Sequence, residues 1–539
     1  MIQIFSNPKE GELNEIVRSA FERSCGLNSV SLSDYQNFNK SSVLNSAEGV
    51  NKNTLFNILV FINPAIEISA LLIDLMRHHT CKVIVFGKLS AGLASFLEVE
   101  IHPVTEKMKS AAECEPAKTY HFSESVGAIV YKKTLEIHGE QSTMPLRALS
   151  RFDFTNEWNN LGFGAIKVDD SIWSISQRAS IAEQAVIADL MVGDEVLSAY
   201  CGLWDFSQSS LLWLNRAVGP VDSYEWFLIE QFISQYRFGD IPAWPVICEI
   251  PHGYESAVTI RLDCDEDIGS ARALGDAYQE KNIPFSLALH AEVLSDSNQH
   301  QYPKEVLQAG GAILSHTLTH APNWGGSEEA AKYEGNESAK IIHETVGIKP
   351  RYAVSPFHHT PSYARKGLAA AGYKGCVGGI ISSDPDFLMA RAGRPPHSRG
   401  GFIGHTQQCM LHGDCMLEGG DALVIFKRAY DQAKFSKTFF GYLDHPFSPR
   451  YQYGWKAEEE RIKAHMEFIE YIQRSSDKTI FMNQDDAMDF LYKKSSVRIR
   501  EFSGQLQVDF LDTDNGSNFN ICIQYGPSQY SLNANGVSL

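Results

Sequence analysis

The sequence predicts an α/β protein with a barrel of alternating parallel strands and helices. This barrel follows an α/β plus β-rich N-terminal region and precedes a short β appendage. Three observations predict this class. Short β-branched apolar runs alternate with helical segments from residue 257 to about 493. The first of these runs ends in clustered carboxylates. Residues 384–420 are rich in Gly, Pro and His, a composition typical of long functional loops on one rim of a barrel.

Length and composition limit the function classes. A chain of 539 residues exceeds one ordinary domain. The formal net charge of −18 argues against nucleic-acid binding, which needs a basic face, and against docking on anionic lipid. No run reaches the roughly 18 apolar residues of a membrane-spanning helix. The N-terminus lacks the basic and apolar regions of a secretory signal, and the ten cysteines are scattered, so we expect reduced thiols and a cytoplasmic location.

Residues 1–105 are expected to form an α/β domain of flavodoxin-like or Rossmann-like type. Apolar runs of strand length alternate here with segments of helical periodicity, which is typical of a small parallel sheet. The expected strands are 1–5, 55–62 and 82–86, and the expected helices are 12–23 and 67–78.

Residues 106–249 are expected to form a β-rich accessory domain. The expected strands are 126–131, 165–168, 195–200 and 211–214. An amphipathic helix follows at 222–236, with Asp222 as its N-cap. No catalytic constellation is visible before residue 245.

Proline-containing breaks at 241–245 and 250–253 indicate a linker before a barrel domain at 250–495. Its expected strands are 257–260, 285–289, 311–314, 352–355, 375–381 and 438–443. Its expected helices are 270–281, 303–308, 328–346, 362–371 and 458–474. Residues 496–539 are expected to form a β appendage with three short strands.

The strand at 257–260 continues into a cluster of acids. Asp263, Asp265, Glu266 and Asp267 occur within five residues. Burying several carboxylates together is costly without a cation or a shared proton, so a divalent metal is the simplest explanation. A solvated acidic loop is the alternative.

About fifty residues later, the strand at 311–314 runs into the sequence SHTLTH. His316 and His320 are four residues apart, so they share a face if this segment is helical. One aspartate and two histidines form an open three-ligand set with a position left for water, as in catalytic zinc sites. A second group, Cys409, His412 and Cys415, does not have the spacing of the common zinc motifs, and we interpret it as packing or loop residues.

Residues 254–490 resemble the polysaccharide deacetylase (NodB-homology, carbohydrate esterase) family. The resemblance rests on four motifs in order along the chain: RLDCDED, SHTLTH, the Ser355–Phe357 turn, and the strand end Leu443–His445. It implies a deformed (β/α) barrel and a metal-dependent amide hydrolase. It also implies one divalent ion, zinc first, with cobalt, nickel or manganese as alternatives.

The resemblance implies a role for each motif residue. Asp263 is the expected general base and His445 the expected general acid. The expected metal ligands are Asp265, His316 and His320. The expected substrate-binding residues are Pro356, Phe357, His358 and Leu443, with a backbone N–H near Phe357 helping to hold the oxyanion.

Two departures from the family pattern leave alternatives open. Cys264 separates two aspartates that are adjacent in the family, so either Asp265 or Asp267 is the carboxylate ligand. The arginine usual before the proline motif is absent, and Arg351 or Arg261 could replace it.

The expected activity is removal of an N-acetyl group from a sugar in O-antigen or capsule biosynthesis. The expected substrate is a free, nucleotide-linked or lipid-linked sugar, and homo-oligomerisation is left open. A deformylase or another C–N amide hydrolase of the same fold is one alternative. A non-catalytic sugar-binding relative is another.

Overall fold

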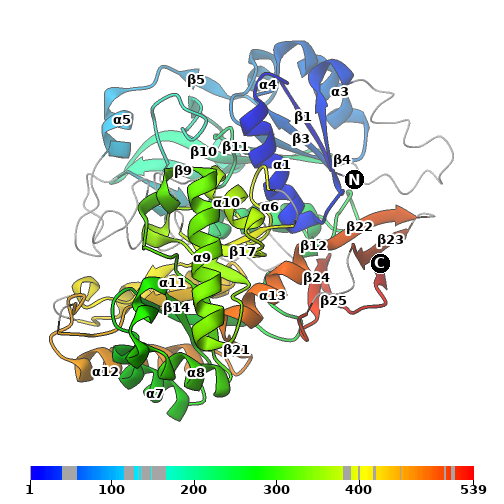
Figure 1. The fold of residues 1–539 in the computed structure, drawn as a ribbon. Coiled ribbons are helices and arrows are strands. Elements are labelled where there is room, and N and C mark those ends of the chain that lie inside the picture. The colour runs from blue at the N-terminus through cyan, green and yellow to red at the C-terminus, as the bar shows by residue number, and fades with distance from the viewer. Residues whose placement is uncertain are drawn as a thin grey trace.

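The computed structural model describes residues 2–38, 58–113, 127–132, 135, 147–148, 166–379, 390–398, 401–416, 420–449, 451–502, 505–511 and 516–539. A large sheet formed by the N-terminal half lies beside a barrel, and the C-terminal strands lie near the N-terminus (Figure 1). Within the described ranges, no helix is both long enough and apolar enough to cross a membrane.

The N-terminal half is built on one nine-stranded sheet in the order β2-β1-β3-β4-β11-β10-β9-β6-β7. Strands β2, β1, β3, β4 and β11 are parallel, and the others pair antiparallel. The strands are β1 (Ile2–Ser6), β2 (Val30–Asp34), β3 (Ile58–Ile62), β4 (Cys81–Phe86), β6 (Gly127–Tyr131), β7 (Arg147–Ala148), β9 (Val186–Val192), β10 (Glu195–Asp205) and β11 (Ser209–Leu214). Strands from residues 1–105 and from 106–249 therefore share one sheet, and a domain boundary near residue 105 stays a prediction.

Helices cover both faces of the parallel part of this sheet. They are α1 (Gly11–Cys25), α3 (Ser69–His78), α4 (Ala91–Phe96) and α6 (Ser223–Ser234); α5 (Glu106–Glu113) lies near β6. Alternate residues of β3 point to opposite faces, as the period of a strand requires. Val60 belongs to the core that includes α1 and α6, whereas Leu59 and Phe61 belong to the core under α3 and α4.

Two local expectations in this half have clear outcomes. Asp222 caps α6, because its carboxylate accepts a hydrogen bond of 2.8 Å from the Glu225 N–H. The strand expected at 165–168 is wrong over its described residues, where only an isolated bridge joins Lys167 to Ser174. The chain turns directly afterwards, since Asp169 accepts hydrogen bonds from the backbone and hydroxyl of Ser171.

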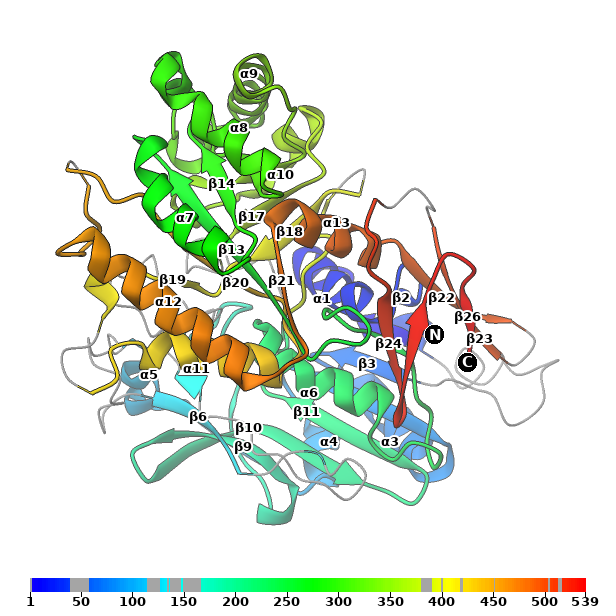
Figure 2. The ribbon, with the colours of Figure 1, turned by 90° about the horizontal axis from the view of Figure 1, so that it is seen from below.

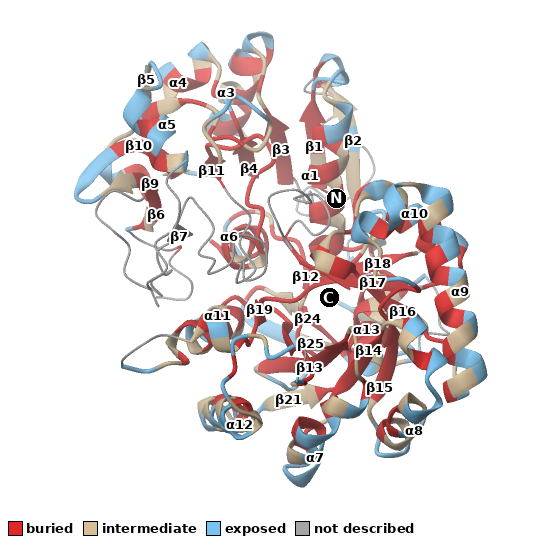
Figure 3. Ribbon diagram, turned by 60° about the vertical axis from the view of Figure 1, so that its left-hand side comes forward, coloured by how far each residue is buried: buried red, intermediate tan, exposed pale blue. Residues whose placement is uncertain are grey.

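The second half forms the deformed barrel of parallel strands that the sequence predicts. Its strands are β13 (Ser256–Cys264), β14 (Ser286–Leu289), β15 (Ala312–Ser315), β16 (Tyr352–Val354), β17 (Gly375–Gly378), β18 (Ile403–Thr406), β19 (Cys409–Met410), β20 (Phe440–Asp444) and β21 (Thr479–Met482). They pair in the order β18-β17-β16-β15-β14-β13-β20-β19, with β21 beside the first half of β13. Figure 3 shows these strands as largely buried, except β21, which is mostly intermediate.

The two edge strands of this order, β18 and β19, are joined through Gln407 and Gln408. The Gln407 N–H donates to Gly378 O at the end of β17, and the Gln408 N–H donates to Gly441 O in β20. The chain therefore bends from one edge of the sheet to the other at these two residues. This bend closes the barrel within the segment that the sequence predicts as loop.

Within the described part of this half, seven helices surround the barrel. They are α7 (Arg272–Glu280), α8 (Gln301–Gln308), α9 (Glu328–Val346), α10 (Ser362–Ala370), α11 (Val424–Phe435), α12 (Glu458–Ser475) and α13 (Gln484–Lys494), and several are seen end-on or from the side in Figure 2. Helix α9 has the bounds that the sequence predicts. Ser327 caps its first turn through a hydrogen bond from the Ala330 N–H, and Gly347 ends it at φ 94°.

The C-terminal strands form two small sheets. Strand β23 (Gln505–Phe510) lies between β22 (Val497–Phe502) and β26 (Val537–Ser538), and β24 (Ile521–Tyr525) lies between β12 (Val246–Ile247) and β25 (Ser528–Leu532). The linker before the barrel is thus paired with the C-terminal region. A separate two-stranded sheet joins β5 (Glu100–His102) to β8 (Arg178–Ser180).

A buried ion cluster lies where the two halves meet. Arg391, which precedes the closing strand of the barrel, forms two hydrogen bonds of 2.9 and 2.6 Å to the Glu230 carboxylate of α6. Glu249 lies 3.6 Å from the same guanidinium. All three side chains are buried, and Lys494 supplies a second positive charge that acts on Glu249.

Candidate metal centre

The acidic and histidine motifs meet at one rim of the barrel because their strands are parallel. Asp263 lies near the end of β13 and Asp265 directly after it, while His316 follows β15 and His445 follows β20. The parallel pairing of β13 with β20 sets Leu262 opposite Asp444, so these two strands end at the same level. Parallel strands bring their carboxyl ends to the same rim, where barrel enzymes build their sites.

Asp265, His316 and His320 lie close enough to share one ion. Asp265 Oδ1 is 3.2 Å from His316 Nε2 and 3.5 Å from His320 Nε2, and the two histidine nitrogen atoms are 3.1 Å apart. All three donor atoms lie within 4.8 Å of one another. Asp265 Oδ1 is buried and accepts no well-formed hydrogen bond from the described residues. One oxygen and two imidazole donors suit a divalent transition metal with an open position.

The electrostatics of these three residues also favour a cation. Burial opposes the charge of Asp265, but His316, His445 and His320 outweigh it and hold the pKa of Asp265 well below its usual range. Burial likewise opposes a charged His316, but Asp265 and Asp263 raise the pKa of His316. Burial, with His316 nearby, lowers the pKa of His320 to about 4, which leaves it a neutral donor. Positive charge is thus stabilised between Asp265 and His316.

Hydrogen bonds behind these residues orient their donor atoms. His316 Nδ1 donates to Val354 O at 3.1 Å, which leaves Nε2 directed at Asp265. His290 Nδ1 donates to the Asp265 backbone oxygen at 2.8 Å. No sequence pattern links His290 to the acidic loop, because His290 and Asp265 are 25 residues apart.

The segment carrying both histidines is not helical. The prediction that His316 and His320 share one face of a helix is therefore wrong. Thr317 has φ 67° and His320 has φ 54°, and these left-handed residues turn the chain tightly. The Glu334 carboxylate of α9 accepts hydrogen bonds from the N–H groups of Leu318 and Thr319, at 2.9 and 3.0 Å. The two imidazoles therefore converge through a loop fastened to α9.

Asp267, the alternative carboxylate ligand, is engaged elsewhere. It accepts hydrogen bonds from Ser270 Oγ at 2.5 Å, Gln299 Nε2 at 3.0 Å and the Gly269 N–H at 3.1 Å. These bonds hold the turn that precedes α7. The geometry brings Asp265, and not Asp267, to the two histidines.

Asp263 is held by an arginine from its own strand. Arg261 Nε donates to Asp263 Oδ1 at 2.5 Å, and both side chains are buried. Burial alone would raise the pKa of Asp263, but Arg261 and His316 lower it, so the carboxylate is ionised. Gln407 Oε1 accepts from Arg261 at 2.5 Å, and Gln407 Nε2 lies 3.1 Å from His358 Nδ1.

The other candidate for the missing arginine is engaged away from Asp263. Arg351 donates to the Asp489 carboxylate of α13 at 2.6 and 2.8 Å and lies 3.3 Å from Asp485. Arg261 is therefore the arginine that contacts Asp263 in this structure.

His445 lies across the centre from the other two histidines. Its Nε2 is 3.5 Å from Asp265 Oδ2, and its Nδ1 is 2.8 Å from His412 Nε2. The Tyr453 ring stacks on it at a centroid distance of 4.2 Å, and the Tyr453 hydroxyl donates to Asp265 Oδ2 at 3.4 Å. Sequence reasoning missed Tyr453 and interpreted His412 as a packing or loop residue, because neither residue lies in a motif that indicates a site.

His412, Asp444 and His445 form a second set of close donor atoms. Asp444 already accepts hydrogen bonds from His465 at 3.0 Å, Trp455 at 3.2 Å and the His445 N–H at 2.7 Å. Its lone pairs are therefore used by protein donors. We interpret this set as a buried hydrogen-bond network behind His445.

The expected substrate-binding residues lie around the same rim. Phe357 and His358 have φ of 53° and 61°, and the Phe357 ring lies 5.0 Å from the His320 ring. Pro356 and His358 are buried, and burial lowers the pKa of His358 to about 3, so its imidazole is neutral. Leu443 is fully buried beside Arg261 in the strand register.

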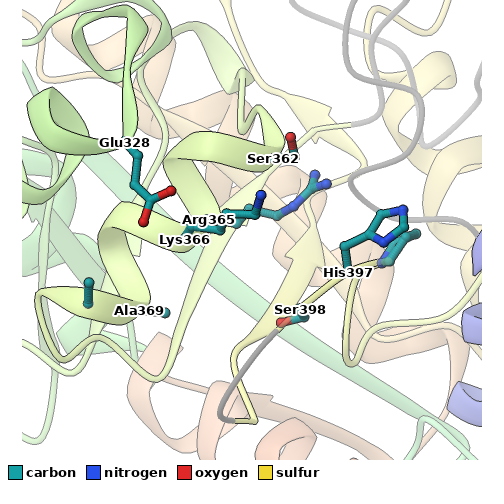
Figure 4. Close-up of a pocket in the computed structure, with 9 residues that line it drawn as sticks. Glu328, Ser362, Arg365, Lys366, Ala369, His397 and Ser398 are labelled. Carbon is teal, nitrogen blue, oxygen red and sulfur yellow. The ribbon is translucent and has the colours of Figure 1, made fainter. Parts of the chain in front are cut away.

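A separate pocket of about 380 Å³ lies between α10 and the segment 396–398 (Figure 4). Its lining includes Arg365, Lys366, His397 and Glu328, so it carries both signs of charge. None of the motif residues lines it.

Comparison with known proteins agrees with the resemblance seen in the motifs. Residues 267–376 match the family model described as polysaccharide deacetylase, so this segment of the barrel is of polysaccharide deacetylase type. The match includes His316, His320 and the Pro356 turn, whereas Asp263, Asp265 and His445 lie outside it. The match supports a hydrolase of the deacetylase class.

Several solved structures resemble part of the chain at low sequence identity. A putative polysaccharide deacetylase from Mycobacterium smegmatis has 16% identity and a TM-score of 0.36, over 45% of this chain and 92% of that chain. A family 4 acetyl xylan esterase from Clostridium thermocellum, in complex with cobalt, has 12% identity and a TM-score of 0.30, over 44% of this chain and 91% of that chain. No curated protein sequence matches the chain.

Proposed function

We propose that this protein is a metal-dependent hydrolase that removes an N-acetyl group from a sugar. The observation that supports this most is the convergence of Asp265, His316 and His320 beside an ionised Asp263 and the imidazole of His445. This arrangement offers a cation site, a proton acceptor and a proton donor at one rim. Amide hydrolysis needs all three, because an amide carbonyl is a poor electrophile and an amine a poor leaving group.

In the proposed reaction, Asp265, His316 and His320 hold one divalent ion, with zinc as the first choice and cobalt, nickel or manganese as alternatives. When bound, such an ion supplies Lewis acidity to the acyl carbonyl and lowers the pKa of a water molecule. Asp263 accepts a proton from the attacking water at its carboxylate. His445 donates a proton to the departing amine nitrogen. The products are the free amine and a carboxylate.

Other residues shape the proposed site. Arg261 holds the Asp263 carboxylate in a fixed orientation through its guanidinium. The Tyr453 ring fixes the plane of His445 by stacking on it. We assign Leu443 to the pocket for the acyl methyl group, and the Pro356–His358 turn to contact with the substrate, its backbone near Phe357 helping to hold the oxyanion.

We further propose that the substrate is a sugar intermediate of surface polysaccharide (O-antigen or capsule) biosynthesis, in nucleotide-linked or lipid-linked form, and that the protein acts in the cytoplasm. The acidic net charge is compatible with a small-molecule or glycan substrate and argues against a nucleic-acid partner.

The direct test is acetate release from N-acetylated sugar nucleotides by the metal-loaded full chain. We expect Asp263→Asn and His445→Ala to lower kcat by several orders of magnitude while the bound metal remains. His343→Ala is the matched control, since His343 is exposed on α9. Acetate release that is unchanged in both site variants would contradict the assigned roles.

Two alternatives share this geometry and give different results in the same assay. A deformylase or another C–N amide hydrolase would release formate or open a different amide without releasing acetate. A non-catalytic sugar-binding relative would bind the sugar in metal-loaded form and release nothing.

A further inference from the structure

Two free cysteines lie opposite each other where the linker before the barrel pairs with the C-terminal hairpin. Figure 1 shows the two elements involved, β12 and β24, side by side. In the antiparallel pair of β12 and β24, Val246 is opposite Gln524 and Ile247 is opposite Ile523. The next residue of each strand continues this register, since the Cys248 N–H donates to Cys522 O at 2.8 Å. Residues directly opposite in an antiparallel pair project their side chains on the same side.

The two thiol groups interact with each other. Contact with Cys522, followed by burial, raises the pKa of Cys248 well above its usual value. Contact with Cys248 is also the largest influence on Cys522, whose pKa is lowered against the effect of burial, with help from Lys437. A thiol with a lowered pKa supplies the thiolate that thiol–disulfide chemistry requires.

The surroundings of the pair distinguish it from the other cysteines. Cys248 is partly exposed, whereas the other eight cysteines that the structure describes are buried. The pair therefore lies nearer the protein surface than the other described cysteines, and its two thiol groups are close enough to interact. Cys248 also precedes Glu249, which contacts Arg391 in the ion cluster between the two halves.

We propose that Cys248 and Cys522 are a modification site at which a peroxide forms a reversible disulfide between the linker and the C-terminal hairpin. One sulfur is oxidised to a sulfenic acid as the peroxide O–O bond breaks and one water leaves. The other sulfur attacks it, the S–S bond forms and a second water leaves. Two thiols and one hydrogen peroxide thus give one disulfide and two waters. The inference is independent of the proposed hydrolase activity.

The crosslink would close a covalent loop of chain that contains the whole barrel, because Cys248 precedes the barrel in sequence and Cys522 follows it. Closing a long loop restricts the unfolded chain more than the folded one. The oxidised protein should therefore unfold at a higher temperature than the reduced protein. It should return to the lower midpoint when a dithiol reductant is added.

The test is peptide mapping of the full-length protein after hydrogen peroxide treatment, alkylation of free thiols and digestion with trypsin. Cleavage after Arg237, Arg261 and Arg500 places Cys248 and Cys522 in peptides 238–261 and 501–539, each with a single cysteine. We expect these two peptides as one crosslinked species, lighter than their sum by two hydrogen atoms. Dithiothreitol should separate them.

Cys248→Ser and Cys522→Ser should each abolish this species and the rise in unfolding temperature. Cys201→Ser is the matched control, since Cys201 is a buried cysteine of β10. The proposal is overturned if wild-type protein yields both peptides separately alkylated after oxidation. It is also overturned if Cys248 accumulates sulfinic acid without any crosslink to Cys522.

Discussion

Arg261 and Asp263 form a buried ion pair within one strand of the barrel, with Arg261 Nε 2.5 Å from Asp263 Oδ1. They are two residues apart, so their side chains project from the same side of β13. The arginine that the family carries before its proline motif is absent here, and the partner of the aspartate comes instead from its own strand. The orientation of Asp263 therefore depends on a residue that the motif comparison left undecided.

Arg261→Lys should lower kcat by roughly 10- to 100-fold, because lysine keeps the charge but not the two-point contact. Arg261 lowers the pKa of Asp263, so weakening the contact should raise that pKa. The acid limb of the kcat/KM profile should then move to higher pH. Arg351→Lys is the control, and an equal shift in both variants would exclude the specific role of Arg261.

Glu334 on α9 should control metal affinity although it is not a ligand. Its carboxylate holds the backbone of Leu318 and Thr319, between the two ligand histidines. Glu334→Ala should weaken metal binding by roughly 10- to 100-fold, measured by competition with a chelator. Glu344→Ala, on the exposed side of the same helix, should leave affinity unchanged. Equal affinity in the two variants would show that the loop holds its shape without Glu334.

The ion cluster between the two halves should be essential for stability. Glu230→Ala leaves the buried Arg391 guanidinium without its two hydrogen bonds to a carboxylate. We expect a loss of about 3–5 kcal/mol in the free energy of unfolding, from denaturant titration. The double variant Glu230→Met with Arg391→Met should lose less, since the buried Glu249 that remains still interacts with Lys494. A small loss in the single variant would mean that Glu249 alone satisfies Arg391.

Lys82 should make stability depend on pH. It is fully buried in β4, and burial lowers its pKa to about 7, whereas an unfolded lysine titrates near 10.5. Between these two values the unfolded chain binds more protons, so this group makes stability rise with pH. Lys82→Met should remove that rise and stabilise the protein near pH 7. Lys88→Met, at an exposed site, should keep the wild-type profile; a profile unchanged by Lys82→Met would refute the assignment.

The sequence predicted most barrel elements because they carry strong local signals. Helix α9 has helical periodicity, a serine cap and a terminal glycine, and its bounds match the expectation. The strand that closes the barrel was missed because β18 and β19 are short and the bend depends on Gln407 and Gln408. The single N-terminal sheet was also missed, since β4 pairs with β11 more than one hundred residues later in the chain.

The candidate site was likewise predictable only where its residues lie in local sequence motifs. Asp265, His316 and His320 lie in recognisable motifs, and the structure brings their donor atoms together, while their catalytic roles stay predictions. Glu334 and Tyr453 lie outside any motif. They reach the site only through tertiary packing, which the local sequence does not encode in a readable pattern.

The central claim is that Asp265, His316 and His320 share one ion. Anomalous diffraction at the zinc absorption edge, from crystals of the full chain grown with zinc, tests it most directly. We expect one strong peak within coordination distance of Asp265 Oδ1 and both histidine Nε2 atoms, and no peak there in His316→Ala crystals. A peak bound by Asp267, or by the His412–Asp444–His445 set without Asp265, would contradict the account.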